Sequence, residues 1–512
     1  MNRDKIYLTG IILLVIGLSF SRAFVSISYV IIIATWLFDK KVLDKFAAFF
    51  KNKAALALAS IYFLHLLGLL YTSDFSYAWL DIRTKIPLLI LPLVFSTISK
   101  FSKREFIAVL LIFALSVTAS FGTAVFYLIK DSPVDFREAF HFVSHIRLSL
   151  MAVIALSIFL WLSFDKRPNM PTWTKFIFII FSLFLIYAIG ILGVMSGMLL
   201  MALTSLSLVI IYLLKGGKGK SLLWSSFFVL FFIATGFYVF EVVKNYNTAV
   251  KSGKTASLTA RGNKYEDLSK EFPVENGSYI GDAVCFKEMK EAWNKRSEIP
   301  FDSLDIQQNA IKYTLLRYLN SKHLSKDYEG VMKLDSLDVA NIEKGFANYE
   351  YTKTFSVKKR IYKVLWEYDI FKKGYGNINE SSGIKRLFLW KTGLELIAQN
   401  PLFGVGTGDV KKSFNKRLQA DNSPLAKTGL RAHNQFISIA VAFGIAGLLF
   451  FVFVLFYPMI KSRAYDFLFL TFFIAYFFSM LWEDSLETQI GVTIFAFFYP
   501  FYLFLNPFEK RK

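Results

Sequence analysis

Histidine and arginine side chains gather immediately before a long apolar segment near the C-terminus. Arg431, His433 and Asn434 directly precede the apolar run that begins at Phe436. A neutral imidazole can accept a proton from a hydroxyl group near neutral pH, as general-base catalysis requires. Asn434 could orient this imidazole or cap the following helix, and the pair alone does not separate these roles. His433 is therefore the candidate catalytic base.

Arginines are expected at the same membrane face as His433. Arg386, Arg431 and Arg147 each carry a guanidinium group, which matches phosphate oxygens with two parallel hydrogen bonds. Arginines at an interface also bind lipid head groups or extend to the surface without any substrate role. Trp390 lies four residues after Arg386, on the same helix face, where it either contacts substrate or packs. Together with Asn434, these residues are candidates for substrate binding.

Two further histidines are expected at the outer end of a membrane helix. His141 and His145 are four residues apart, a spacing that suits one metal ion or a solvated helix face. No cysteine cluster, metalloprotease motif or calcium-loop motif accompanies them, and Cys285 is the single cysteine. We therefore predict no metal and no cofactor, and His145 stays a candidate for substrate binding.

Two other polar stretches have simple structural interpretations. Residues 404–409 read GVGTGD but lack the lysine of a phosphate-binding loop, so a tight turn is predicted there, with anion binding by its amides as a secondary possibility. Glu483, Asp484 and Glu487 predict a solvated acidic connector, with a substrate role as the alternative. His65, within an apolar run, is predicted to be buried and hydrogen-bonded.

The elements that position these groups are membrane helices. Hydrophobic residues make up 55% of the 512 residues and charged residues only 19%, which is typical of an all-α polytopic membrane protein. A spanning helix needs roughly 20 apolar residues, and tilt or tight hairpins allow shorter ones. About twelve such helices are predicted, at residues 6–20, 24–38, 54–71, 86–98, 107–129, 148–164, 176–193, 194–214, 222–240, 436–460, 467–482 and 490–505.

Charge predicts the orientation of these helices. The net charge of +21 comes from lysines and arginines that cluster in alternate connectors, so it indicates topology and not nucleic-acid binding. The positive-inside rule places those connectors and both termini in the cytoplasm. No convincing cleavage site follows the first apolar run, so we expect the N-terminus to be retained. The basic stretches are residues 40–53, 100–104, 166–167, 215–220, 461–463 and 510–512.

One external segment is far too long for a connector. Residues 1–240 are predicted to form a transmembrane region of about nine helices, and residues 433–512 the last three helices and a cytoplasmic tail. Between them, residues 241–432 are expected to form a mostly helical periplasmic insert, because apolar residues recur at helical spacing after possible caps at Ser303 and Ser336. Residues 262–281 and 372–383 are expected to be its loop-rich borders.

These motifs together resemble one known family. The chain is similar to bacterial O-antigen ligase and O-antigen polymerase proteins in its many spans and its late external segment. The specific likeness lies in Arg386-x-x-x-Trp390, in the stretch NPLFGVGTG at residues 400–408, in His433-Asn434, and in FGIAG at residues 443–447. Many relatives also carry a Ser-Arg-Gly-like motif where this chain reads GVMSG at residues 193–197, without an arginine. Arg147 could supply the missing charge.

The resemblance implies a metal-independent glycosyltransferase of the bacterial inner membrane. Its donor would be an undecaprenyl-pyrophosphate-linked glycan and its acceptor lipid A-core, with His433 as the base and Arg386 as a pyrophosphate ligand; Arg431 is plausible on geometry alone. A polymerase of the same family, which extends a lipid-linked glycan, is the close alternative. A transporter ranks lower, because it would place ionisable residues in the middle of several spans. Expected partners are these substrates and membrane lipids, without nucleic acid.

Overall fold

The protein is mostly helical. The computed structural model describes residues 3–508 except 132, 134–135, 215–233, 235, 249–256, 276, 354–356 and 373–381. Within the described residues, the regular β-structure is one two-stranded sheet, in which β1 (Val274–Glu275) pairs antiparallel with β2 (Ser278–Tyr279). The fold class predicted from the sequence, all-α, is therefore confirmed.

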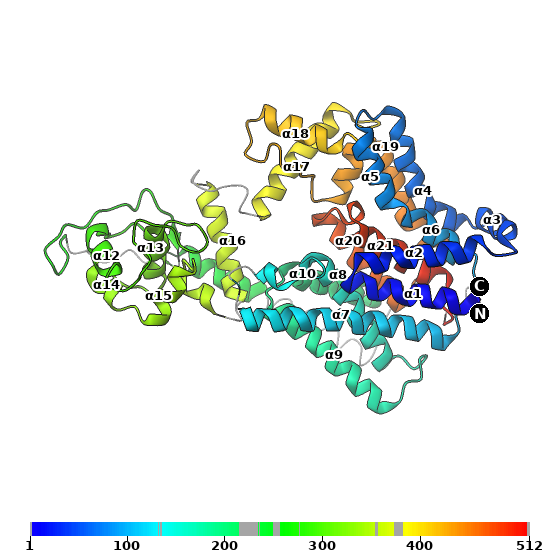
Figure 1. The fold of residues 1–512 in the computed structure, drawn as a ribbon, viewed down its shortest axis with the longest axis horizontal. Helices are drawn as coiled ribbons and strands as arrows, with labels where there is room; N and C mark the ends of the chain where they lie inside the picture. The colour runs from blue at the N-terminus through cyan, green and yellow to red at the C-terminus, as the bar shows by residue number, and fades with distance from the viewer. Residues whose placement is uncertain are drawn as a thin grey trace.

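Apolar helices from both halves of the sequence form one bundle (Figure 1). Its N-terminal part begins with α1 and α2, which pack as an antiparallel pair because the turn at Ser21 is tight and the Ser21 hydroxyl caps α2 through Phe24 N. The helices of this part are α1 (Arg3–Phe20), α2 (Arg22–Leu37), α3 (Val42–Lys51), α4 (Lys53–Leu67), η1 (Gly68–Tyr71), α5 (Phe75–Lys85), α6 (Pro87–Phe95), α7 (Lys103–Asp131), η2 (Phe136–Ala139), α8 (His145–Phe164), α9 (Thr172–Ile191) and α10 (Met195–Leu214).

The C-terminal helices complete this bundle. The helix α19 packs against α4, α20 against α8 and α10, and α21 against α6, so the last three apolar helices insert among the first ten. The elements of this part are α17 (Ser382–Gln399), α18 (Val410–Ala420), α19 (Gln435–Lys461), α20 (Phe467–Trp482), η4 (Ser485–Glu487) and α21 (Gln489–Phe504).

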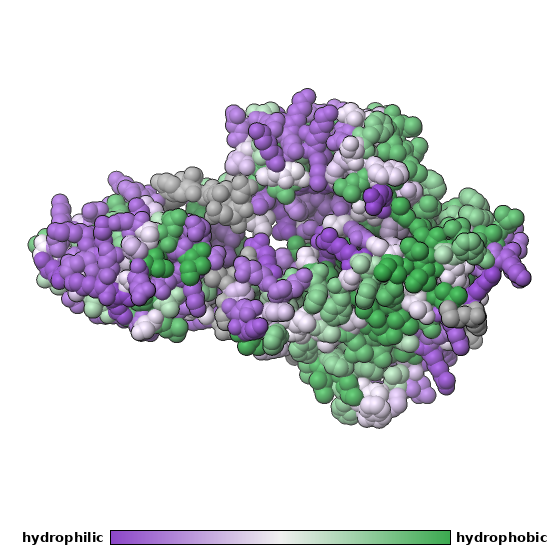
Figure 2. All heavy atoms as spheres, in the orientation of Figure 1, coloured by the Kyte–Doolittle hydropathy of each residue, from purple (hydrophilic) through white to green (hydrophobic). Residues whose placement is uncertain are grey.

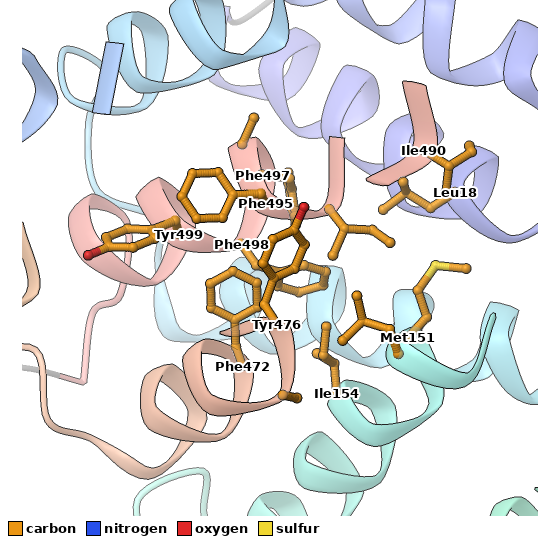
Figure 3. Close-up of a cluster of buried hydrophobic side chains, with 14 of the residues drawn as sticks. Leu18, Met151, Ile154, Phe472, Tyr476, Ile490, Phe495, Phe497, Phe498 and Tyr499 are labelled. Atoms are coloured by element: carbon orange, nitrogen blue, oxygen red, sulfur yellow. The ribbon is translucent and has the colours of Figure 1, made fainter. Parts of the chain in front are cut away.

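A dense aromatic core fixes the hairpin of α20 and α21 (Figure 3). Phe472 and Tyr476 of α20 pack between Phe498 of α21 and Met151 of α8, and all four side chains are fully buried or nearly so. The hydroxyl of Tyr476 donates to the carbonyl oxygen of Gly491 at 3.0 Å, which satisfies its polar end. Packing of this density holds the connector between α20 and α21 in one position.

A separate small helical cluster projects from the bundle. It has its own buried core, which includes Trp293, Leu315 and Ile342. Arg317 joins it to the next helix, because its guanidinium group pairs with Glu275 at 2.8 Å and stacks 3.5 Å from the ring of Trp366. The helices concerned are α12 (Phe286–Trp293), α13 (Ile311–Ser321), α14 (Tyr328–Met332), α15 (Ser336–Glu343), η3 (Tyr349–Thr352) and α16 (Val357–Lys372).

Helix starts in this cluster differ from those predicted. The residue that caps α15 is Asp335 and not Ser336, because Asp335 and Asp338 form a reciprocal capping box. The helix α13 starts at Ile311, well after Ser303, because the carboxylate of Asp305 accepts from the amides of Gln307 and Asn309 and folds that stretch into a turn. Helices are the main regular structure among the described residues of this segment, and a mostly helical periplasmic insert stays a prediction.

Six described helices are long and apolar enough to cross a membrane, or seven if the bent pair α2 and α3 counts as one span. The count of about twelve stays a prediction, since α6, α20 and α21 are shorter apolar helices and most of the predicted span 222–240 lies outside the described residues. In Figure 1 both chain ends lie at one end of the bundle, and the cluster of α12–α15 lies beyond the other end.

Candidate active site

The acidic connector between α20 and α21 is buried, which corrects the prediction of a solvated loop. Glu483 and Asp484 are only 8% and 6% exposed, and the side chain of Glu487 is 8% exposed. Buried carboxylates need cations or hydrogen-bond donors, and helices from distant parts of the sequence supply both. The connector is thus the centre around which the candidate residues gather.

Glu483 brings three of the predicted site residues together. Its carboxylate oxygens lie 3.5 Å from Arg386 Nη2, 3.9 Å from Arg147 Nη2 and 3.7 Å from His433 Nδ1. These residues come from α17, from α8 and from the segment before α19. Their side chains are 20–30% exposed, so the cluster is reachable from outside.

The backbone at His433 is held in an unusual conformation. Its φ of 49° lies in the left-handed region, which histidine tolerates better than most residues. Asp484 fixes this turn, because its carboxylate accepts from the amides of His433 and Asn434 at 3.0 Å each and from the hydroxyl of Ser438 at 2.7 Å. The Asn434 side chain caps α19 by accepting from Phe436 N and Ile437 N. Of the two roles considered for Asn434, the structure therefore shows the helix cap.

Burial acts differently on the two neighbouring carboxyl groups. Burial opposes ionisation of Glu483, but His433, Arg147 and Arg386 outweigh it and lower the pKa of this carboxyl. Burial raises the pKa of Asp484, and the hydrogen bond from Ser438 offsets only part of that effect. Glu483 is thus held as an anion beside the imidazole.

Arg431 belongs to a second, more deeply buried group around Glu487. It forms an ion pair with Glu487, and its Nη2 lies 3.5 Å from Asp81 Oδ1. Lys85 bridges the same two carboxylates, at 2.5 Å from Asp81 and 2.7 Å from Glu487. The side chain of Arg431 is only 9% exposed, so this arginine is a link between α5 and the connector.

His65 lies at the edge of this second group. It is 3% exposed, and its Nδ1 lies 3.1 Å from Asp81 Oδ2. Its ring also meets Phe443 edge to face at 4.8 Å. The prediction that His65 is buried is confirmed, whereas the predicted hydrogen bond is not shown, because neither ring nitrogen has a hydrogen-bond partner among the described residues.

Several buried polar atoms of the first group lack hydrogen-bond partners among the described residues. They are Arg386 Nε, His433 Nδ1, Glu483 Oε2 and the indole nitrogen of Trp390. Buried polar groups nearly always have hydrogen-bond partners in folded proteins. Several such groups without partners at one place therefore favour the binding of a polar ligand there. Trp390, one turn beyond Arg386 on α17, also packs partly against the core.

Arg147 is anchored at the start of α8. Its Nε donates to Thr488 at 2.8 Å and its Nη1 to Ser144 at 2.9 Å, so the guanidinium group is fixed beside Glu483. Two residues along α8, Ser149 approaches Gly197 of α10 so closely that an added Cβ would lie 3.0 Å from the serine hydroxyl. The segment that lacks the expected arginine therefore packs directly on the helix that carries Arg147.

His145 packs among aromatic rings at the start of α8. It is the first residue of α8, and its ring packs against Phe136 and Phe140 at 5.3 and 5.9 Å. His141 lies outside the helix, with its ring centre 4.0 Å from that of Tyr127 and the two rings tilted by 38°. Among the described residues, no group of three or more His, Cys, Asp or Glu side chains is placed to hold a metal ion.

The glycine-rich turn is used for packing and not for an anion. Its amides donate to protein oxygens, with Val405 N bonded to Val441 O and Gly406 N to Ala442 O at 2.9 Å each. Those carbonyls are available because α19 is broken at Gly444, whose φ is 68°. The prediction of a turn is confirmed, and the secondary possibility of anion binding by these amides is wrong.

The fold and this site define a multi-pass membrane protein with a polar cluster at one end of its helices. Residues 348–452 match the family model Wzy_C, described as O-Antigen ligase, which confirms the predicted resemblance and supports an enzyme of the O-antigen ligase or polymerase kind. The matched segment contains Arg386, Arg431 and His433, but neither Arg147 nor the acidic connector. No curated protein matches the chain significantly.

Proposed function

We propose that the protein transfers a glycan from undecaprenyl pyrophosphate to lipid A-core, as an O-antigen ligase of the inner membrane. The observation that supports this most is that Glu483 brings His433, Arg386 and Arg147 together at the end of the bundle. A base and a pair of phosphate-binding cations are what such a transfer needs. Both termini would be cytoplasmic, and the cluster of α12–α15 periplasmic.

His433 is the base in this proposal. The acceptor hydroxyl oxygen attacks the anomeric carbon of the donor sugar, and the bond from that carbon to the pyrophosphate oxygen breaks. Undecaprenyl pyrophosphate leaves with the electron pair, while His433 takes the hydroxyl proton through Nε2 and later releases it to water. Glu483, beside Nδ1, orients the ring and stabilises the imidazolium ion.

Arg386 and Arg147 stabilise the leaving pyrophosphate. Both face Glu483 at distances longer than a hydrogen bond, so their remaining donors can turn to phosphate oxygens. Arg386 offers its Nε, which has no partner among the described residues. Trp390 and His145 are proposed to border the sugar and lipid portions of the substrates. In this proposal the two arginines stabilise the pyrophosphate without a metal ion.

Arg431 takes a different role from the substrate contact expected at first. Its ion pairs with Glu487 and Asp81 leave it 9% exposed, so we propose that it positions the turn of His433. Asn434 acts in the same way as the cap of α19. A group held by two buried carboxylates stays rigid, and rigidity of the supporting residues is what keeps a base aligned.

A polymerase of the same family is the second candidate, because the matched segment does not separate the two activities. It would use the same donor and the same base but would extend a lipid-linked glycan. A transporter is disfavoured, because the described polar clusters lie at one end of the helices.

The test is a transfer reaction with purified full-length protein, undecaprenyl-pyrophosphate-linked glycan and lipid A-core, followed by gel analysis of the product. We expect product with wild type in the presence of EDTA, and a loss of roughly 10²–10³-fold with His433→Asn and with Arg386→Ala. Lys391→Ala is the matched control, because Lys391 lies on the same helix as Arg386 with a side chain 77% exposed.

The outcomes separate the candidates. Full activity of His433→Asn would overturn the role of the base, and loss of wild-type activity with EDTA would overturn the metal-independent step. If lipid A-core yields no product while lipid-linked glycan alone is extended, the protein is a polymerase.

A further inference from the structure

A cavity of about 480 Å³ lies between α5 and α18, and one of its lining residues, Tyr77, contacts Arg431. This volume is within the range of small-ligand sites. It is separate from the cluster of His433, Arg386 and Arg147, and the proposed transfer does not use it. We call it the α5–α18 groove, and it is lined by Asp74, Tyr77, Lys411, Lys412, Asn415, Lys416 and Gln419.

The lining is strongly cationic. Three of its residues are Lys411, Lys412 and Lys416, and none forms an ion pair with a carboxylate in the described part of the chain. Arg417, on the same helix but outside the lining, is by contrast paired with Glu395 at 2.8 Å and Asp421 at 3.1 Å. The lining thus has three lysines against the one carboxylate of Asp74, and Asp409 beside Lys412 offsets part of the remaining charge, so the groove keeps an excess of positive charge.

The carboxylate in the lining is already engaged. Asp74 caps α5 by accepting from Tyr77 N at 3.0 Å. Lys412 donates to the Ser73 hydroxyl at 3.0 Å and keeps its other donors. Asn415 and Gln419 add neutral amide groups, so the groove offers donors to an anion from one whole side of α18.

The groove adjoins the membrane-facing surface of α5. Leu80, three residues after Tyr77 and on the same side of this short helix, is 56% exposed, whereas the exposed Phe75 and Trp79 lie on its opposite side. Figure 2 shows the hydrophilic surface of α18 beside the apolar surface of α4 and α19. Aromatic residues next to lysines are typical of the interface between lipid and water, where head groups lie.

One side chain connects the groove to the candidate active site. The ring of Tyr77 contacts two cations, with Lys411 at 4.8 Å and Arg431 at 5.0 Å from its centre. Arg431 in turn pairs with Glu487, next to the segment that carries His433. A ligand that draws Lys411 away from Tyr77 would therefore act on a residue that supports the site.

We infer that the α5–α18 groove binds the anionic phosphate head group of a lipid in the same membrane. The lysines pair with phosphate oxygens, the amides bind the adjoining hydroxyl groups, and the exposed Leu80 lies against the acyl chains. The phosphate can belong to a phospholipid or to a phosphorylated glycolipid, because both present the same charge at this depth.

Native mass spectrometry of the full-length protein in detergent tests this site, with phosphatidylglycerol, lipid A, phosphatidylcholine or inorganic phosphate added separately. We expect an anionic lipid to bind wild type about 10- to 30-fold more tightly than Lys411→Gln/Lys416→Gln. Lys391→Gln/Lys427→Gln removes the same charge outside the groove and should bind like wild type. Lys411→Arg/Lys416→Arg keeps the charge and should retain binding, which separates lost charge from misfolding.

Each result has a defined meaning. Preference for phosphatidylglycerol or for lipid A supports the inference and identifies the source of the phosphate. Equal binding of an anionic lipid to wild type and to Lys411→Gln/Lys416→Gln overturns it, as does equally tight binding of phosphatidylcholine or of inorganic phosphate alone. Because binding is measured, the result does not depend on whether the proposed transfer occurs.

Discussion

Nδ1 of His433 lies 3.7 Å from Oε1 of Glu483, too far for a hydrogen bond and near enough for one to form after a small movement of either side chain. Two arginines approach the same carboxylate. An incoming pyrophosphate would bind these arginines and draw them away from Glu483. The carboxylate of Glu483 would then be free to hydrogen-bond with the imidazole of His433. Donor binding would then complete the alignment of the base.

Glu483→Gln should lower the turnover rate without weakening donor binding. The amide keeps the shape of the side chain but loses the charge that stabilises the imidazolium ion, so we expect kcat to fall by at least ~10-fold, within the ~10²–10⁴-fold lost when a base is removed. Arg386 and Arg147 would be released from Glu483, so KM for the donor should stay constant or fall. Initial rates at varied donor concentration measure both quantities.

Arg386→Ala provides the contrasting variant, since it should raise KM for the donor. A Glu483→Gln protein with normal kcat and raised KM would show that Glu483 binds substrate and does not orient the base.

The left-handed conformation of His433 predicts an order of stabilities among variants without the base. Asn adopts this conformation readily, whereas a β-branched residue is strained there by roughly 1–2 kcal/mol. His433→Asn should therefore keep the melting temperature of wild type, and His433→Val should melt several degrees lower. Thermal unfolding in detergent, followed by tryptophan fluorescence, compares them. Equal melting temperatures would show that the turn relaxes.

Glu487→Gln should destabilise the protein at neutral pH and less so in acid. Burial opposes ionisation of this carboxyl, but Arg431 and Lys85 lower its pKa well below the ordinary value of about 4.5. The stabilisation is therefore fully present above that pH and is lost as the pH falls towards the lower folded-state value. Removing one partner of a buried ion pair costs about 3–5 kcal/mol. The melting temperatures of wild type and variant should differ at pH 7 and converge below about pH 4.5.

Glu395→Gln is the control for this experiment. The pair of Glu395 with Arg417 is about one-third exposed, so its loss should cost about 0–1 kcal/mol at every pH. A Glu487→Gln protein as stable as this control would contradict a structural role for the buried network.

Cysteine labelling should place the cluster of α12–α15 outside the cytoplasm. Cys285 is 4% exposed and burial raises the pKa of its thiol, so it should not react in the native protein. Leu337→Cys, at a position 70% exposed on α15, should react with a membrane-impermeant maleimide in intact spheroplasts. Lys166→Cys, in the exposed connector between α8 and α9, should react only after permeabilisation. Labelling of Lys166→Cys alone in intact spheroplasts would reverse the proposed orientation.

Sequence patterns predicted most of the fold, because the bilayer forces apolar runs into helices. Eleven of the predicted spans fall on described helices, although α6 is only 9 residues long. The cap at Asp335 and the late start of α13 were not predicted. Both depend on which of several neighbouring polar side chains accepts a hydrogen bond from the backbone amides.

The site was predicted only in part. Arg386, Arg147 and His433 were identified by residue type and position, but the carboxylate that brings them together was expected to be solvated. Acidic residues in a connector are usually exposed, and Glu483 and Asp484 are buried only because α8, α17 and the start of α19 pack around the connector. A cue was present, since three carboxylates at the outer end of a span match the number of expected cations. The pairing of Arg431 with Glu487 could not be read from either segment alone.

The break of α19 at Gly444 makes two distant stretches into one unit. A Cβ at Gly444 would lie 2.2 Å from the carbonyl carbon of Leu402, and a Cβ at Gly404 would lie 2.5 Å from the carbonyl carbon of Ala442. Each glycine therefore allows the backbone of the other segment to pass close by. Carbonyls exposed by a break within a span need donors, since lipid supplies none. Chimaeras with related proteins must therefore exchange residues 400–408 and 441–447 together, because either stretch grafted alone would leave an unbonded backbone inside the bilayer.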